Sequence, residues 1–238
     1  MIFLLYGIVF SPPEGHSPPR LPPGVGGAPV RLIDEGVLGA AISWIEPPDV
    51  TPNLARALSY AKVVEALHAD RVVLPMRYGC LFGEERQVVE LLRVHGGEYA
   101  ALLRGLDGCV EMGVRVLVQR TEGRAQVAEV PSHPPGRAYL AGRTAVYAAK
   151  DRRAHEEGRV VERYREAFAG LFVKFRAEYS SARAPDVALY FLVKRGAVDS
   201  FRQAFGRISR AESARLLLSG PWPAYNFAAP ERQGNGHG

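Results

Sequence analysis

The pattern of apolar and polar positions divides the N-terminal part of the chain into strands and one long connection. Residues 2–10 are almost entirely apolar and rich in β-forming side chains, which is typical of an interior strand buried on both faces. Residues 30–34 and 37–45 predict two strands joined by a tight Glu-Gly turn. The seven prolines between residues 11 and 29 exclude a helix or a central strand from the connection.

Helical spacing begins after residue 50. Thr51 and Pro52 supply an N-cap and a proline at the first helical position, so we predict a helix that ends near residue 69. Its apolar face is predicted to consist of Leu54, Leu58, Ala61 and Val64.

A strand and two further helices follow. Residues 71–76 predict the strand, and residues 84–95 predict an amphipathic helix whose acidic first turn complements the helix dipole. Gly96 and Gly97 are predicted to end this helix, and residues 98–106 form a separate short one.

The longest helical pattern covers residues 136–181, which contain no proline and carry charged residues along most of their length. Its second half has apolar residues at steps of three and four, namely Val161, Tyr164, Phe168, Leu171, Phe172, Phe175 and Tyr179. Gly158 marks a bend or a break into two helices. We predict a long charged helix that either supports a sheet or presents a partner-binding face.

The remaining elements complete a second β-α-β-α-β unit. Strands are predicted at residues 109–119, 186–194 and 214–218, and a helix at residues 197–208. The alternation of strands and helices predicts an α+β protein with two domains, at residues 1–106 and 107–238. Each domain is expected to be related to the ferredoxin-like arrangement, with helices on one face of a sheet.

The net charge is unevenly distributed between the two halves. Residues 1–108 hold 9 basic and 12 acidic side chains, a net charge of −3, whereas residues 109–238 hold 21 and 13, a net charge of +8. A basic half can attract nucleic acid, but here the positive residues are interleaved with glutamate, and no Lys/Arg run exceeds two residues. The sequence therefore favours a solvated basic surface over a nucleic-acid-binding surface.

Sequence signatures of catalysis and of metal binding are absent. The chain has no GxGxxG, GxxxxGK[ST], GxSxG or HExxH pattern, so the usual phosphate-binding, hydrolase and zinc-protease sites lack their requirement. The six histidines are scattered, and Cys80 and Cys109 form no CxxC pair or His/Cys cluster. We therefore expect no enzyme activity, no metal and no cofactor.

The first ten residues do not predict a targeting segment. They have no basic n-region and no small-residue cleavage site, and they are too short to span a membrane. We expect a cytoplasmic protein without a membrane span.

Four stretches carry information beyond the fold. They are Tyr6-Gly7-Ile8-Val9, Gly27-Ala28-Pro29-Val30-Arg31, Leu74-Pro75-Met76-Arg77-Tyr78-Gly79 followed by Phe82, and Gly220-Pro221-Trp222-Pro223-Ala224-Tyr225-Asn226-Phe227. In this order and spacing they resemble the gas vesicle protein GvpF/GvpL family over nearly the whole chain. Ala224 departs from the family pattern, where a second proline is usual, and Tyr60 stands where many members have a histidine. Because this chain has tyrosine at that position, a catalytic role for the histidine of the other members is disfavoured.

The resemblance implies a minor, non-enzymatic component of gas vesicle assembly. It implies an N-terminal modified ferredoxin-like domain, a C-terminal α+β domain and association with the vesicle. It also implies binding to the small hydrophobic shell protein GvpA, whose aggregation the protein would restrain, with other gas vesicle proteins as further candidate partners. A chain with sheet edges and a long helix can accept an amphipathic partner by strand addition or by a helix in a groove.

Two other classes of function stay open. One is a haem-binding enzyme built on tandem ferredoxin-like halves, in which His68 or His155 would be the proximal ligand. The other is a nucleic-acid-binding module in which Tyr190 and Phe191 provide stacking aromatics, although only one of two adjacent strand residues can face outward.

Arg77 is the first candidate site residue, because it follows a predicted strand and lies close to Gly79. We expect its guanidinium to bond carboxylates or carbonyl groups near the domain junction, since arginine can serve several acceptors at once. A direct contact with a partner is the alternative.

The aromatic tail at residues 220–227 supplies the other candidates, Trp222, Tyr225 and Phe227. Pro221 and Pro223 are predicted to end the last strand near residue 219. The three aromatic side chains either fill a groove between the two domains as a clamp, or stay exposed as a docking site for the shell protein.

Overall fold

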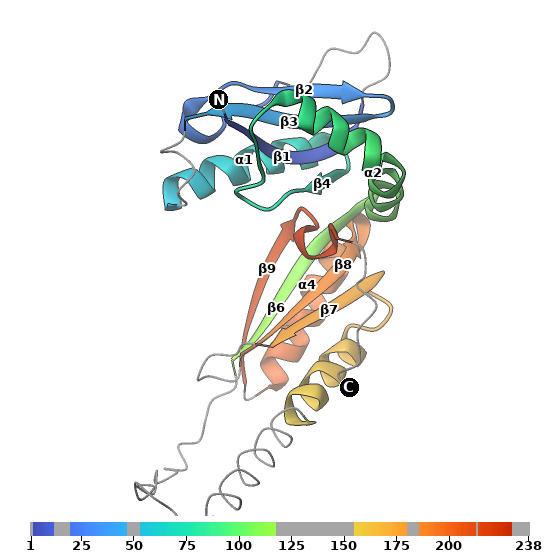
Figure 1. The fold of residues 1–238 in the computed structure, drawn as a ribbon. Coiled ribbons are helices and arrows are strands. Elements are labelled where there is room, and N and C mark those ends of the chain that lie inside the picture. The colour runs from blue at the N-terminus through green and yellow to red at the C-terminus, as the bar shows by residue number, and fades with distance from the viewer. Residues whose placement is uncertain are drawn as a thin grey trace, which may run out of the picture. The chain divides into compact units, whose positions relative to one another are not determined.

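The computed structural model describes residues 2–11, 20–46, 53–117, 155–179, 186–212 and 214–229. The fold is α+β with two antiparallel sheets (Figure 1), as the sequence predicts. The chain divides into two compact units. The first unit holds Met1–Met112, Leu192–Arg195 and Gly220–Gly238, and the second holds Gly113–Phe191 and Gly196–Ser219. The predicted boundary between residues 106 and 107 stays a prediction.

The first sheet is built around β1, as its apolar sequence predicts. The strand order is β2-β3-β1-β4, and β5 also pairs with β1. Consecutive side chains of β1 are buried, because both faces of this strand are covered. The bounds are β1 Ile2–Phe10, β2 Val30–Glu35, β3 Leu38–Ile45, β4 Val73–Pro75 and β5 Leu81–Phe82.

Helix α1 (Leu54–Asp70) packs on one face of this sheet through a buried stripe that shares only Val64 with the predicted one. Its N-cap is Asn53, whose side chain accepts a hydrogen bond from the backbone N–H of Arg56. Leu54 and Leu58 are exposed, and the buried residues are Tyr60, Val63, Val64, Leu67 and His68. The predicted stripe was drawn through Leu54 and Leu58, and these two leucines lie on a different side of the helix from the buried residues. The predicted cap, residues 51–52, lies outside the described residues.

Helix α2 (Glu85–Leu106) is one continuous helix, and the prediction that Gly96 and Gly97 end it was wrong. Each glycine costs roughly 1 kcal/mol relative to alanine, which the buried apolar face of the helix offsets. This face, Val88, Leu92, Ala100, Leu103 and Leu106, continues on both sides of the glycine pair. At Gly96 an added Cβ atom would lie 3.8 Å from Leu38 of β3, so the helix passes close to the sheet at this point.

The two helices cover opposite faces of the first sheet, which corrects the expectation that they share one face. Tyr60 of α1 stacks on Tyr6, whose hydroxyl bonds Ser43 of β3. Leu38, beside α2, lies five positions earlier on the same strand and therefore points to the other face. This arrangement explains why β1 and β3 are buried on both sides.

The second sheet has the strand order β7-β8-β6-β9. Its helices, residues 155–167 and α4 (Val198–Ala211), lie against the same side of the sheet. Phe168, directly after the first of these helices, and Phe201 of α4 both contact Phe191 of β8. The strand bounds are β6 Cys109–Leu117, β7 Lys174–Tyr179, β8 Asp186–Lys194 and β9 Arg215–Trp222.

The predicted long helix was wrong at its C-terminal end. The described helix ends at residue 167, Gly170 takes a left-handed backbone with φ +80°, and β7 begins at Lys174. The sequence of β7, KFRAEY, alternates strictly between charged and apolar residues, which indicates a half-buried strand. The part of the prediction at residues 136–154 lies outside the described residues.

Strand β9 continues through Pro221 to Trp222, so the prediction that it ends near residue 219 was also wrong. β9 is an edge strand, and a proline there does not remove a hydrogen bond from the interior of the sheet. Gly220 has φ +103°, and an added Cβ atom would lie 2.6 Å from the carbonyl oxygen of Glu111. This position therefore requires glycine.

Candidate functional site

The aromatic tail is anchored within the first unit by a buried carboxylate. Glu111 of β6 is only 4% exposed, and its two carboxylate oxygens accept hydrogen bonds from the backbone N–H and the side-chain amide of Asn226, at 2.8 and 2.7 Å. A buried carboxylate costs free energy unless such donors satisfy it. The pairing therefore fixes the short helix η4 (Tyr225–Phe227) against β6.

The tail has a buried side and an exposed side. Phe227, Pro223 and Ala224 are buried, so they form the apolar base of the tail. Trp222 and Tyr225 keep 43% and 38% of their surface exposed. Phe227 thus acts as an internal anchor, whereas Trp222 and Tyr225 present aromatic surface on a fixed backbone.

Tyr225 remains a hydrogen-bond donor at neutral pH. Burial, together with the nearby carboxylates of Glu65 and Glu111, raises the pKa of Tyr225 to about 12. The phenol is protonated at neutral pH, as it would be at its ordinary pKa, and a partly exposed ring with a polar hydroxyl is well suited to an interface.

Among the described residues, Arg77 does not form the contacts that the sequence led us to expect. The residue is exposed, and among the described residues its guanidinium has no hydrogen bond or ion pair. The backbone around it is ordered by a turn, in which the Cys80 N–H donates to the Arg77 carbonyl at 3.2 Å and Gly79 has φ +89°. Arg77 is therefore a solvent-facing cation on a fixed turn.

A cluster of tyrosines holds this turn in place. The Tyr60 hydroxyl donates to the Met76 carbonyl at 2.7 Å and also approaches the Tyr6 carbonyl at 3.1 Å. The Tyr60 ring stacks on Tyr6 and meets Tyr78 edge-on. Burial raises the pKa of Tyr60 far above its ordinary value, so the hydroxyl stays a donor. Tyr60 has a structural role that the sequence did not reveal.

His68 is buried against Arg195 in the first unit, and burial keeps its ring neutral. The Arg195 guanidinium lies 3.0 Å from Nε2 of His68 and donates to the His68 carbonyl at 2.6 Å. Arginine has no acceptor, so Nε2 must accept and Nδ1 carries the proton. Burial, and secondarily the charge of Arg195, lowers the pKa of His68 to about 4. This engaged ring nitrogen makes His68 a poor haem ligand.

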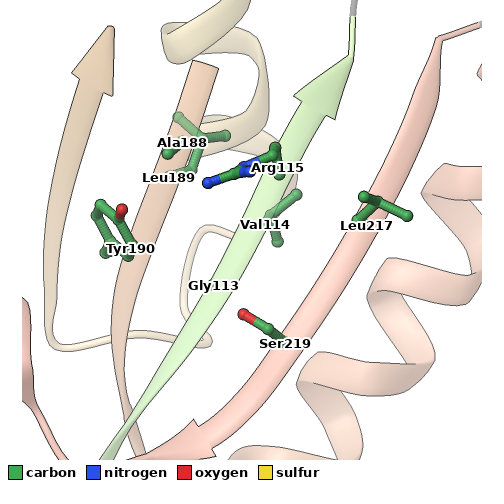
Figure 2. A pocket seen from close by; sticks show the side chains of 8 residues that line it. All are labelled: Gly113, Val114, Arg115, Ala188, Leu189, Tyr190, Leu217 and Ser219. Atoms are coloured by element: carbon green, nitrogen blue, oxygen red, sulfur yellow. The ribbon is translucent and has the colours of Figure 1, made fainter. Parts of the chain in front are cut away.

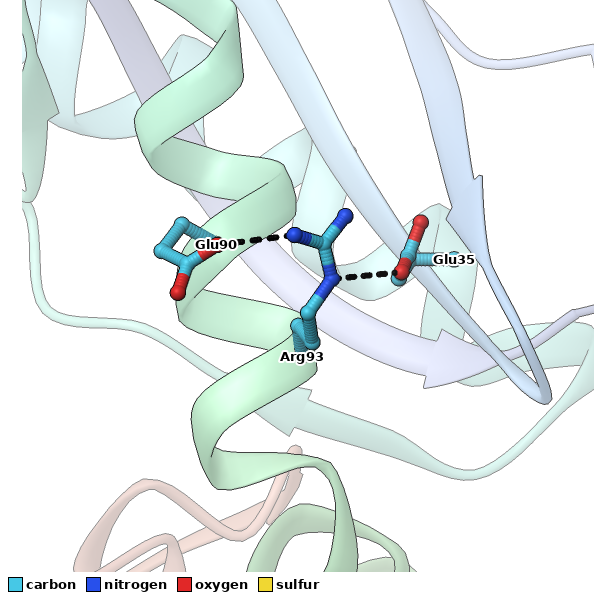
Figure 3. A network of polar contacts seen from close by, with 3 residues as sticks. All are labelled: Glu35, Glu90 and Arg93. Atoms are coloured by element: carbon cyan, nitrogen blue, oxygen red, sulfur yellow. Dashed lines mark hydrogen bonds and ion pairs between the residues drawn. The ribbon is translucent and has the colours of Figure 1, made fainter.

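The ion pairs on α2 are surface contacts. Arg93 joins Glu90 of its own helix to Glu35 at the end of β2, at 3.0 and 3.2 Å (Figure 3). Its side chain is 61% exposed, so each pair contributes at most about 1 kcal/mol to stability. We assign this network to helix positioning and not to a binding site.

A concave surface of about 300 Å³ lies on the second sheet (Figure 2). Strands β6, β8 and β9 supply its lining, including the side chains of Arg115, Tyr190 and Leu217. Tyr190 lies on this surface while Phe191 is fully buried, so the two adjacent aromatics face opposite sides of the sheet.

The described residues contain no group of three or more His, Cys, Asp or Glu side chains able to hold a metal ion. In the same described parts, no helix is long and apolar enough to cross a membrane. The geometry thus presents surfaces for contact: the tail, the Arg77 turn and the concave sheet face.

Comparison with known proteins identifies the family. Gas vesicle protein F from Streptomyces sp. (strain CB03234) is 30% identical over 243 residues, which cover 94% of this chain and 98% of that protein. Gas vesicle protein L from the same strain is 28% identical over 86% of this chain and 85% of that protein.

Two crystal structures have the same fold. GvpF from Anabaena sp. PCC7120 matches with a TM-score of 0.76 at 17% identity, over 99% of both chains. GvpF from Microcystis aeruginosa matches with a TM-score of 0.74 at 16% identity, over 96% of this chain and 99% of that chain.

The family model described as gas vesicle synthesis protein GvpL/GvpF matches residues 3–229. The resemblance carried by the four sequence stretches is thereby confirmed. Because the match spans almost the whole chain, the protein belongs to the GvpL/GvpF family of gas vesicle synthesis proteins, which are structural gas vesicle proteins and not enzymes.

Proposed function

We propose that the protein takes part in gas vesicle assembly by binding the hydrophobic shell protein GvpA and limiting its aggregation. We further propose that it acts in the cytoplasm, in association with the gas vesicle, and that it contacts other gas vesicle proteins there. Membership of a gas vesicle synthesis family supports the process. The proposed binding of GvpA is supported by the exposed aromatic side chains of the tail, whose backbone is held in place.

The tail carries the proposal. An aggregation-prone apolar protein is kept in solution when its apolar surface is covered by a complementary one. Trp222 and Tyr225 offer such a surface, and aromatic side chains are enriched among the residues that dominate binding energy. The Glu111–Asn226 pairing and the buried Phe227 fix the tail backbone before binding, which lowers the entropic cost of association.

Arg77 is proposed as a polar contact beside this apolar one. Its guanidinium projects from a fixed turn and has no partner among the described residues. A free guanidinium can bond a carboxylate or several carbonyl groups of a partner.

Co-expression with the shell protein tests the proposal. The measurement is the fraction of shell protein that stays in the supernatant after high-speed centrifugation, with and without this chain. We expect the double variant Trp222→Ala/Tyr225→Ala to lose most of the solubilising effect. Removing one central aromatic anchor costs about 2 kcal/mol, which corresponds to roughly a thirtyfold weaker affinity.

Trp44→Ala is the matched control, because Trp44 is 45% exposed and lies on β3, not in the tail. The control should solubilise the shell protein as well as the unmodified chain. If the shell protein aggregates equally with and without the unmodified chain, the proposed function is wrong. If Trp44→Ala and the double variant lose the effect equally, the tail is not the contact.

A further inference from the structure

One face of the second sheet is left uncovered by the described elements. Phe191 of β8 contacts aromatic residues from both helical segments of the second unit, so this side of the strand is covered. Ala188 and Tyr190 alternate with Leu189 and Phe191 and point to the other side. This open face consists of Gly113, Arg115, Ala188, Tyr190, Leu217 and Ser219, which line the 300 Å³ concavity (Figure 2).

The middle of the open face is flat because its residues are small. Gly113, Ala188 and Ser219 come from the three neighbouring strands β6, β8 and β9. An added Cβ atom at Gly113 would lie 2.5 Å from the Ser219 hydroxyl oxygen, so the hydroxyl would have to rotate to admit a larger side chain. Around this floor stand Leu217, which is 44% exposed, and Tyr190.

The described charges of the open face are predominantly positive. Arg115 is exposed on β6, and Arg215 precedes Leu217 by two positions on β9, which places both arginines on this face. On β7 the Tyr190 hydroxyl bonds Glu178, so Arg176 and Lys174 share the open side with Glu178. Four cationic side chains therefore share this side of the sheet with Glu178 and with Glu111, and Glu111 is buried and already paired with Asn226. The exposed charge is thus mainly positive, which favours an acidic partner.

We propose that the open face binds an acidic amphipathic helix of a partner protein. The small-residue floor lets a helix backbone approach the sheet, and Leu217 meets its apolar stripe. The arginines at the rim pair with carboxylates on the flanks of the helix. This site is separate from the tail, and it does not depend on the identity of the shell protein as the partner.

Charge and aromatic content disfavour two other occupants. A second copy of the chain would bring the same positive face against itself, and like charges across an interface repel. Single-stranded RNA is recognised by sheets that stack bases on two or three aromatics. The open face has one aromatic among its lining residues, Tyr190, and a carboxylate sits at its hydroxyl.

Fluorescence anisotropy on the full-length protein tests the inference. The probe is a labelled model helix with leucine on one face and glutamate on the other, and its matched counterpart carries lysine in place of glutamate. We expect the acidic helix to bind, the basic helix not to bind, and Arg115→Glu to weaken binding at least tenfold. Raising the salt concentration should weaken binding as well.

Arg207→Glu is the control, because Arg207 is exposed on α4, and α4 covers the opposite side of the sheet. It changes the net charge as much as Arg115→Glu does and should leave binding unchanged. If both variants weakened binding of the acidic helix equally, the effect would come from the net charge of the protein, and the proposal would be wrong. No binding of the acidic helix, tighter binding of a uridine oligonucleotide, or dimerisation that Arg115→Glu abolishes would each overturn it too.

Discussion

Within the part of the chain that the structure describes, the two sheets differ in how many of their faces are covered. This difference distinguishes a supporting sheet from one that can also make contacts. In the first sheet, α1 and α2 lie on opposite faces, and consecutive residues of β1 are fully buried. In the second sheet, the described helices share one face, and the other face keeps exposed arginine and leucine side chains. A sheet covered twice positions its loops and helices, whereas a sheet covered once can also bind through its free face.

Paired truncations on the two sheets give the largest expected effect. Leu4 and Leu5 of β1 are both buried, and only Leu4 belongs to the core beneath α1. We expect Leu4→Ala and Leu5→Ala each to lower the unfolding free energy by about 2–5 kcal/mol. In the second sheet, Phe191→Ala should cost about 3–5 kcal/mol, whereas Tyr190→Ala should cost about 1 kcal/mol or less.

Chemical denaturation followed by circular dichroism measures these differences, with separate transitions fitted if the two units unfold independently. If Tyr190→Ala lowered the unfolding free energy as much as Phe191→Ala does, the face of the second sheet that carries Tyr190 would have to be covered. The contrast between the two sheets would then be wrong.

Acid should weaken the first unit through His68. Its pKa lies at about 4 in the folded chain, below the ordinary 6.5, so the unfolded chain binds more protons between these values. The contribution of neutral His68 to the free energy of unfolding is therefore fully present above pH 6.5, and it is lost as the pH falls towards 4. Between pH 7.5 and pH 5 we expect a loss of about 1–2 kcal/mol, or a few degrees in melting temperature.

His68→Gln is the control for this prediction, because glutamine does not titrate and can still accept from Arg195. The variant should have a smaller change in melting temperature between the two pH values. An unchanged pH dependence in His68→Gln would assign the acid effect to other groups.

Arg77→Ala should have the smallest effect on stability. Its exposed guanidinium has no partner among the described residues, so we expect the unfolding free energy to change by about 0.5 kcal/mol or less. Shell-protein solubilisation should fall, and Arg77→Lys should restore only part of it, because lysine lacks the bidentate geometry. A loss of several degrees in melting temperature would show that Arg77 supports the fold after all.

Local sequence patterns predicted the elements whose burial is complete or strictly alternating. The apolar run of β1 predicted its interior position, and the Glu-Gly turn predicted the pairing of β2 with β3. Such patterns suffice because a strand covered on both faces has no position for a polar side chain. The predictions failed at two places that contain glycine. Gly96 and Gly97 lie inside helix α2, which was predicted to end there, whereas Gly170 follows the end of a helix that was predicted to continue. Glycine has the same low helix propensity at both places, so tertiary packing decides whether the helix continues or ends.

The candidate site was predictable only in part. The aromatic and proline content of residues 220–227 identified the tail, but not which aromatic is buried. Glu111 carried a usable signal, because a carboxylate in a strand whose other residues except Arg115 are apolar or glycine needs a partner. Its partner, Asn226, lies 115 residues away, and no pattern in the sequence connects the two.

The sequence by itself determined the family, the α+β composition and the strands with the strongest periodicity, because motif spacing and hydrophobic alternation are properties of the linear chain. Only the tertiary structure decided which faces are covered, which aromatic anchors the tail and where Arg77 points. These outcomes depend on burial against residues distant in sequence, and periodicity within one segment carries no information about what packs on it.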